Sequence, residues 1–285
     1  MGPRVSRAAA GERPNSSRES TGAGPVTGPG RLAFGHVAEL YDRMRPPLPV
    51  RAIDHVLAAG RLGPGALVVE IGAGTGKATV ELARRDLRVL ALEPDAEMAR
   101  VLEANCAPWP GVRVARVEFE CWEADEPARA IVSANAWHWL DPRDRWARAH
   151  RSLAAGGLLA AIWTLPEWSR CPLRSKLGRV YRQLAPDLAP DFPMHPDSNP
   201  MRLAGDWSTE VDECRLFTSP GQRELRWSAR FDATDYPTLL RTHQDHILVE
   251  PEVRERLLMQ VSATVAAHGV LVLPLVTRIC TALRP

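Results

Sequence analysis

Short apolar runs recur between residues 67 and 92, separated by a segment of different character. Leu67–Ile71 and Arg88–Leu92 are rich in aliphatic residues, which is typical of buried strands. Residues 72–85 begin with a glycine-rich stretch and continue with spaced apolar positions. This predicts a tight turn followed by a helix that ends near Arg85. We therefore expect a β-α-β unit in this part of the chain.

The alternation of strand and helix patterns continues to residue 163. Strands are expected at 112–119, 130–134 and 157–163, with a helix at about 96–107. Another helix is expected after Asp141-Pro142, an N-cap residue followed by a first-turn proline. Strands that alternate with helices predict an α/β fold, in which a doubly wound, mostly parallel sheet has helices on both faces.

The pattern changes after residue 163. The next forty or so residues are proline-rich with one helical patch near 177–184, so we expect a helical lid over 165–210, inserted after the fifth strand. The remaining segment, 211–285, is expected to complete the sheet and to contain a helical cap at about 233–267. Its expected elements are strands at 211–217, 224–231 and within 270–281, and helices at about 234–247 and 252–267.

The first thirty residues differ from the rest of the chain. Residues 1–30 are rich in Gly, Pro, Ser, Arg and Ala and hold almost nothing large and apolar, which predicts a disordered tail. Met1–Ser6 fits the loose myristoylation pattern, but we interpret this match as chance. Spaced apolar residues from Phe34 to Ala59 predict two short helices that lead into a core domain at 31–164.

Composition excludes several classes of protein. The 285 residues are 45% hydrophobic and 25% charged, which is typical of one large globular domain. A net charge of +2 does not favour nucleic-acid binding, and no apolar run approaches the roughly 20 residues that cross a membrane. The five cysteines are scattered without a C-x-x-C pair. We therefore expect no disulfide framework, no metal site and a cytoplasmic location.

A glycine-rich turn and one acidic residue suggest a ligand site. Gly72, Gly74 and Gly76 follow the first expected strand, where glycines let the backbone approach a ligand at the carboxyl edge of a sheet. Glu93 follows the second strand, 21 positions after Gly72, where a carboxylate can accept hydrogen bonds from both ribose hydroxyls. The alternative for Glu93 is a solvated residue at a strand end, but the strand, turn, helix and strand context favours the ligand role.

Three segments of the chain resemble the class I methyltransferases that use S-adenosylmethionine (SAM), of the type 11 kind. They are Val68–Thr79, Ala91–Asp95 and Ser133–Pro142, and the similarity spans roughly residues 34–284. The resemblance implies a Rossmann-like sheet of seven strands, SAM as the cofactor, and methyl transfer as the activity. One departure is Leu48, which stands where the family's lead-in segment often has a tyrosine.

The same resemblance implies a set of cofactor residues. It puts the glycines of the turn beside the methionine part of SAM, Glu93 on the ribose, and Glu120 near the adenine. Tyr41 is expected to close over the cofactor, with ordinary packing as the alternative. The full set of expected cofactor residues is Tyr41, Glu70, Gly72, Ala73, Gly74, Thr75, Gly76, Glu93, Pro94, Glu120, Asn135 and Ala136.

His138 is the expected catalytic base. Oxygen and carbon acceptors lose a proton on methylation, and histidine takes up protons near neutral pH. His138 follows the fourth expected strand at the same edge as the glycine turn. If strand geometry persists there, His138 points away from Trp137 and Trp139. The alternative is that His138 only packs and forms hydrogen bonds.

Two other groups of residues have a structural and a functional interpretation. The first lies in an expected helix, and we prefer a solvated or structural helix face to a binding site; it consists of His243, Asp245 and His246. The second could line an aromatic acceptor pocket, but core filling is the preferred interpretation. It consists of the tryptophans in or beside the lid, Trp163, Trp168, Trp207 and Trp227.

The sequence thus predicts a SAM-dependent methyltransferase that acts on a small molecule by in-line displacement. The fourth strand lacks the [DNS]-P-P-[YFW] segment of methyltransferases that modify amino groups of bases, and the sequence leaves open whether O, N or C is methylated. A homodimer is compatible with the sequence. The alternatives are a nicotinamide-dependent oxidoreductase, which the glycine spacing disfavours, and a SAM-binding protein without catalytic activity.

Overall fold

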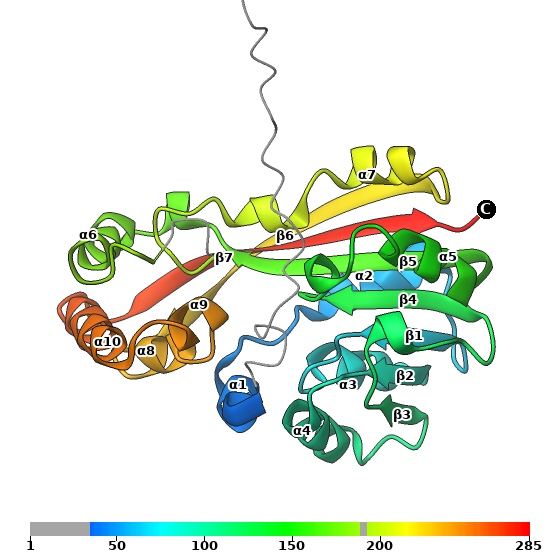
Figure 1. Cartoon of the computed structure of the whole chain (residues 1–285), viewed down its shortest axis with the longest axis horizontal. Coiled ribbons are helices and arrows are strands. Elements are labelled where there is room, and N and C mark those ends of the chain that lie inside the picture. Colours follow the sequence, from blue (N-terminus) through cyan, green and yellow to red (C-terminus); the bar gives the residue numbers. More distant parts are fainter. Residues whose placement is uncertain (1–34, 189–192) are drawn as a thin grey trace, which may run out of the picture.

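The computed structural model describes residues 35–188 and 193–285. The expected tail at residues 1–30 lies outside the described residues. The described part forms one seven-stranded sheet with the strand order β3-β2-β1-β4-β5-β7-β6 (Figure 1). β7 runs antiparallel to β5 and β6, and all the other strand pairs are parallel, so the predicted α/β fold with a mostly parallel, seven-stranded sheet is confirmed. The strands are β1 Leu67–Ile71, β2 Arg88–Leu92, β3 Val112–Ala115, β4 Ala128–Ala134, β5 Leu153–Pro166, β6 Thr218–Phe231 and β7 Leu271–Leu283.

Helices cover both faces of the sheet. On one face α2 and α3 bury Ile53 and Leu82 against the strands, and on the other α5 and α7 bury Trp146 and Trp207. The helices are α1 Ala38–Met44, α2 Val50–Gly60, α3 Lys77–Ala83, α4 Ala96–Cys106, α5 Arg145–Ser152, α6 Arg174–Leu184, α7 Trp207–Cys214, α8 Asp235–Leu240, α9 Gln244–Ile247 and α10 Pro251–Ala266. No helix among the described residues is long and apolar enough to span a bilayer.

The last three strands are more than twice as long as β1 and β2, and they support a second hydrophobic core. In Figure 1, β5, β6 and β7 extend to the left beyond the parallel strands, and α6, α8, α9 and α10 gather around this extension. Leu177 of α6 and Val261 of α10 belong to the same buried cluster as Leu271 of β7. Elements of the expected lid and cap therefore pack on one another as well as on the sheet.

The strand expected at 211–217 is wrong, because most of this segment belongs to α7. The Asp206 side chain caps the helix by accepting a hydrogen bond from the Thr209 N–H at 3.3 Å. Trp207 and Val211 are four residues apart, so both face the sheet, where they are buried. The helix ends at Arg215, which adopts the left-handed conformation that often terminates helices.

The single helix expected at about 234–247 is also wrong, because it is divided into α8 and α9. The interruption falls at Thr242 and His243, and His243 has extended backbone dihedrals. The Thr242 hydroxyl donates a hydrogen bond to the Leu239 carbonyl, and the Thr242 carbonyl accepts one from the Arg45 side chain. Side-chain hydrogen bonds of this kind compete with a continuous helix.

Candidate functional site

The glycine turn after β1 requires glycine at three positions for different reasons. Gly72, Gly74 and Gly76 all have positive φ, between 59° and 92°. A Cβ atom on Gly72 would lie 2.5 Å from the Ala136 side chain, and one on Gly76 would lie 2.6 Å from Leu102. A Cβ atom on Gly74 would meet no protein atom within 4 Å. The middle glycine therefore presents an open backbone surface.

Glu93 connects the turn to the end of β2. Its Oε2 accepts a hydrogen bond from the Gly74 N–H at 2.7 Å, and its Oε1 accepts one from the Asp95 N–H at 2.9 Å. Burial raises the pKa of Glu93, while these two hydrogen bonds act in the opposite direction. Each carboxylate oxygen retains a further lone pair. Glu93 can therefore hold the turn in place and still accept hydrogen bonds from a ligand.

Glu70 lies beneath the turn rather than in the cleft. Its side chain is fully buried, and its Oε2 accepts a 2.6 Å hydrogen bond from the Thr79 hydroxyl of α3. Burial raises the pKa of Glu70 to about 8, so the carboxyl group is mostly protonated at neutral pH. Its arrangement supports the turn from below, and the cofactor role expected from the resemblance stays a prediction.

Seven of the twelve expected cofactor residues line one cleft at the carboxyl ends of the strands: Tyr41, Gly72, Gly74, Glu93, Pro94, Asn135 and Ala136. The other five, which are not in this lining, are Glu70, Ala73, Thr75, Gly76 and Glu120. The Glu120 side chain instead lies 3.4 Å from the Asp141 N–H, which donates a hydrogen bond to it.

Several cleft residues were missed by the sequence analysis. Most are apolar and come from segments that follow β2, β3 and β4: Asp95, Met98, Val117, Glu118, Phe119, Trp139 and Leu140. Their shared signal is their position after the carboxyl end of a strand, which is where ligands bind in such sheets. Phe119, Trp139 and Leu140 provide apolar and aromatic surface against which a flat ring can pack.

Asn135 fixes the end of β4. It has a positive φ of 56°, a conformation that asparagine tolerates better than most residues. Its side-chain Oδ1 accepts a hydrogen bond from the Thr164 N–H of β5 at 2.8 Å, and its own N–H donates to the Ile162 carbonyl. These contacts hold the ends of β4 and β5 together on the floor of the cleft.

His138 lies in a 3-10 helix, Trp137–Trp139, so the expected strand alternation does not apply. Its Nδ1 accepts a hydrogen bond from the Trp163 indole N–H at 3.2 Å. Burial, with a smaller contribution from Arg145, lowers the pKa of His138 to about 4, so the ring is neutral near pH 7. Its neighbour Trp139 lines the cleft and His138 does not. A role as base would require His138 to release Trp163 from its accepting nitrogen.

The cap contains a buried polar network. Asp245 and His246 are 4% and 0% exposed, so of the two preferred interpretations, a solvated or a structural helix face, the burial agrees with the structural one. The Asp245 Oδ1 and the His246 Nδ1 are 2.7 Å apart, and the His246 Nε2 lies 2.7 Å from the Tyr181 hydroxyl of α6. This network connects the lid to the cap. Across residues 35–188 and 193–285, no group of side chains has the arrangement of a metal site.

The four tryptophans in or beside the lid differ in their surroundings. Trp163, Trp168 and Trp207 are at most 2% exposed and lie in hydrophobic clusters, as core filling requires. Trp227 is half-buried, and its indole N–H donates to the Thr277 hydroxyl at 2.9 Å.

A second cavity, of about 350 Å³, lies between the lid and the strand extension. Its charged lining residues are Glu167, Arg174, Glu224, Arg226 and Arg278. Glu224 pairs with Arg226 and Arg278, and Glu167 pairs with Arg226, so both carboxylates are neutralised by neighbours. None of the expected catalytic or cofactor residues lines this cavity, but Trp168, one of the four tryptophans in or beside the lid, does.

The sheet order, the glycine turn and the acidic strand end define an α/β protein with a nucleotide-type cleft at the carboxyl edge of the sheet. A family model described as a methyltransferase domain matches residues 68–157. An uncharacterized methyltransferase of Mycobacterium tuberculosis is 30% identical over 240 residues, covering 84% of this chain and 88% of that protein. The chain belongs to the class I SAM-dependent methyltransferases, and SAM is the cosubstrate of this family.

Solved structures agree with this fold. A proposed type II methyltransferase of Anaeromyxobacter dehalogenans superimposes with a TM-score of 0.54 at 20% identity, covering 84% of this chain and 97% of that one. Phosphoethanolamine N-methyltransferase 2 of Haemonchus contortus gives a TM-score of 0.51 at 12% identity, covering 88% and 57% of the two chains. Family membership decides against the nicotinamide-dependent alternative.

Proposed function

We propose that this methyltransferase acts on a small molecule that binds between the cofactor cleft and the cap. The observation that supports a preformed site for SAM is the hydrogen bond from the Gly74 N–H to Glu93, which joins the turn to the acidic residue at the end of β2. In this proposal the turn holds the methionine part of SAM, Glu93 accepts hydrogen bonds from the ribose, and Phe119 and Leu140 contact the adenine.

The chemistry places modest demands on the protein. When bound, SAM would supply a methyl group on a sulfonium: an electron pair of the acceptor forms the new bond to the methyl carbon as the carbon–sulfur bond breaks and leaves a neutral thioether. The residues of the cleft then contribute mainly by aligning the acceptor and excluding water. Whether the accepting atom is O, N or C decides whether a base is needed. His138 remains our proposed base for an acceptor that must lose a proton.

A small acceptor is favoured by the helices around the strand extension. Lid and cap elements from α6 and α10 pack together around the strand extension, an arrangement that suits an enclosed ligand better than a long polymer. The similar protein from Haemonchus contortus was crystallised with phosphomonomethylethanolamine and S-adenosylhomocysteine (SAH). We extend this proposal to a cytoplasmic protein, since all five cysteines are unpaired. The homodimer stays a prediction to be tested by its mass in solution.

The test combines binding with product detection. We expect wild-type protein to bind SAM in calorimetry, and Glu93→Ala to weaken this affinity about 10- to 100-fold, because ribose contacts and the anchor of the turn are lost together. Methyl-labelled SAM should then label a low-molecular-weight compound in a fractionated extract of the source cells. Unchanged SAM affinity in Glu93→Ala would reject the site, and label found only in protein or RNA would reject the small acceptor.

A further inference from the structure

Arg45 follows α1 and has donors that the protein does not use. Its Nη2 donates to the Thr242 carbonyl at 2.8 Å, and its guanidinium lies 4.7 Å from the centre of the Tyr41 ring. Its Nε is buried and has no hydrogen-bond partner among the described residues. Guanidinium groups present five N–H donors, and Nη2 is the one donor nitrogen of Arg45 with a hydrogen bond to a described residue.

The charge of Arg45 is poorly compensated. No carboxylate of the described residues lies within 4.0 Å of it. Asp245 attracts it from a greater distance; the Asp245 Oδ1 is engaged by the backbone and ring of His246, and the Asp245 Oδ2 is buried without a hydrogen-bond partner among the described residues. Burial lowers the pKa of Arg45, as expected for a cation in such surroundings. A buried charge without a close counter-ion is costly, and a bound anion would compensate the charge of Arg45.

Other groups near Arg45 also favour an anion. Lys77, the first residue of α3, and His243, the N-cap residue before α9, both interact electrostatically with Arg45. The Lys77 ammonium donates to the Asp42 carbonyl at 2.6 Å and lies 3.7 Å from the Asp42 carboxylate. Burial lowers the pKa of His243, so its ring stays neutral and carries one N–H donor.

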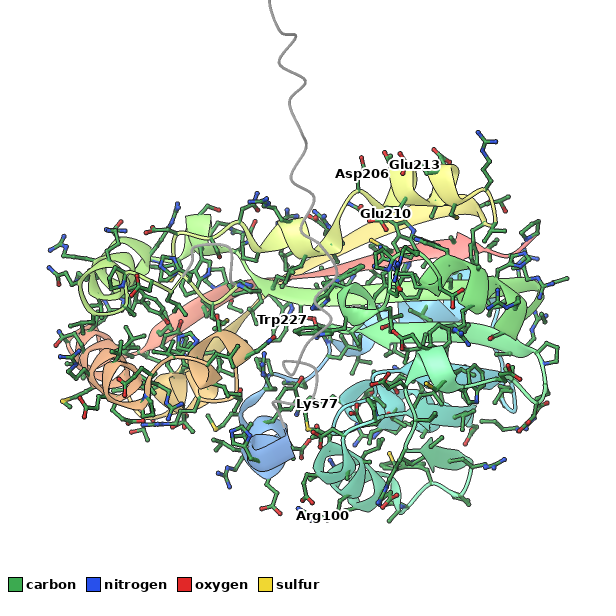
Figure 2. The ribbon with its side chains drawn as sticks, in the orientation of Figure 1. Lys77, Arg100, Asp206, Glu210, Glu213 and Trp227 are labelled. Carbon is green, nitrogen blue, oxygen red and sulfur yellow. The ribbon has the colours of Figure 1, made fainter. Side chains whose placement is uncertain are left out.

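Arg45 lies between the cofactor cleft and the cap. Tyr41 lines the cleft, whereas Arg45, stacked on Tyr41, is not in the cleft lining and is bonded to the segment between α8 and α9. In the view of Figure 2, Lys77 and Trp227 are drawn between the parallel strands and the helices of the cap. This is the region in which the proposed function places the acceptor.

We propose that Arg45 binds an anionic group of the methyl acceptor, a carboxylate or a phosphate, and thereby selects acidic small molecules. This inference rests on the proposed function and adds a substrate class to it. The recognised group is distinct from the atom that is methylated. Arg45 would act as a specificity residue, since a guanidinium can hold a planar or tetrahedral oxyanion through two parallel hydrogen bonds.

The experiment compares Arg45→Gln and Arg45→Lys with Arg43→Gln, a matched control because Arg43 is exposed on α1. Each protein is first shown to be folded by circular dichroism and thermal unfolding. SAH is titrated into each, and then glutarate, benzoate and inorganic phosphate are titrated into the SAH-loaded proteins. We expect at least one anion to bind the wild type and Arg43→Gln, about tenfold weaker binding to Arg45→Gln, and partial recovery in Arg45→Lys.

The outcomes separate this inference from the proposed function. Failure of the wild type to bind SAH would reject the proposed function itself. Normal SAH binding, together with anion binding that is absent or equal in wild type and Arg45→Gln, would overturn only the role of Arg45. A loss of SAH affinity in Arg45→Gln would assign the guanidinium to the cofactor's own carboxylate, which also overturns the acceptor role.

Discussion

The cofactor cleft and the cap solve the problem of buried polar groups in different ways. In the cleft, the Glu93 carboxylate accepts hydrogen bonds from two backbone N–H groups that lie within twenty residues of it in the sequence. The conformation of the neighbouring turn is determined by its own glycines, which have positive φ. In the cap, Asp245 and His246 connect to Tyr181, more than sixty residues away, and Arg45 bonds to Thr242 across almost two hundred. The comparison teaches that the cleft is built locally, whereas the cap, beside which we propose that the acceptor binds, is assembled from remote segments.

The largest expected effect comes from filling the cleft. Gly74→Leu should abolish detectable SAM binding, raising the Kd at least about 100-fold, because the new side chain would occupy the open surface of the turn. Calorimetry measures this. Gly65→Leu is the matched control, since Gly65 also has a positive φ and no atom within 4 Å of an added Cβ, but lies far from the cleft lining. Equal SAM affinity in the two variants would remove the turn from the site.

The second prediction concerns His138, which lies behind the cleft. His138→Ala should lower turnover about 100-fold or more with little change in SAM affinity, if a base is required. With a pKa of about 4, the rate in wild type should rise with pH through that value and be flat near neutrality. His268→Gln, an exposed histidine, serves as control. Unimpaired methyl transfer by His138→Ala, measured with the identified acceptor, would leave this histidine a packing residue.

A change in the cap should affect stability and not the cofactor. Asp245→Asn removes the charge from the buried contact with His246, so the free energy of unfolding should fall by about 1–3 kcal/mol while SAM affinity is unchanged. Urea unfolding and calorimetry measure the two quantities. Glu252→Gln is the control, because it removes the charge of an exposed carboxylate in place of a buried one. A loss of SAM affinity in Asp245→Asn would show that the two regions are coupled, contrary to the comparison.

The effect expected at Glu70 is confined to one pH range. Burial raises the pKa of Glu70 to about 8, whereas the unfolded chain loses this proton near pH 4.5. Between these two pH values the folded state therefore binds a proton that the unfolded state has lost, and the stability of the fold falls as the pH rises. Glu70→Gln keeps an acceptor for Thr79 and should stabilise the protein by more than about 1 kcal/mol at pH 8, with little effect at pH 4. Exposed Glu123→Gln is the control; a pH-independent difference would contradict the burial argument.

Local signals made the parallel half of the fold predictable. Apolar runs predicted β1 and β2 to the residue, and the glycine spacing with Glu93 located the cleft. The segment at 211–217 was misjudged because short apolar runs do not distinguish a strand from a buried helix, and Asp206 caps it as a helix.

The remote parts of the site left no such signal. Nothing in the sequence near Arg45 indicates that its partner is the Thr242 carbonyl, since that contact exists only after α8 ends early. Likewise, Trp163 and His138 meet because β5 runs beside β4, and neither residue predicts the other. Pairings of this kind depend on tertiary packing, which propensity and periodicity do not encode.

The antiparallel placement of β7 has an evolutionary consequence. Phe231 at the end of β6 and Leu271 at the start of β7 are register partners, so residues 232–270 leave and rejoin the sheet at a single pair. Such an excursion can lengthen, shorten or be exchanged between descendants without disturbing the order of the strands. In the function that we propose, selection can thus change the acceptor by altering this excursion while the cleft for the methyl donor is inherited unchanged.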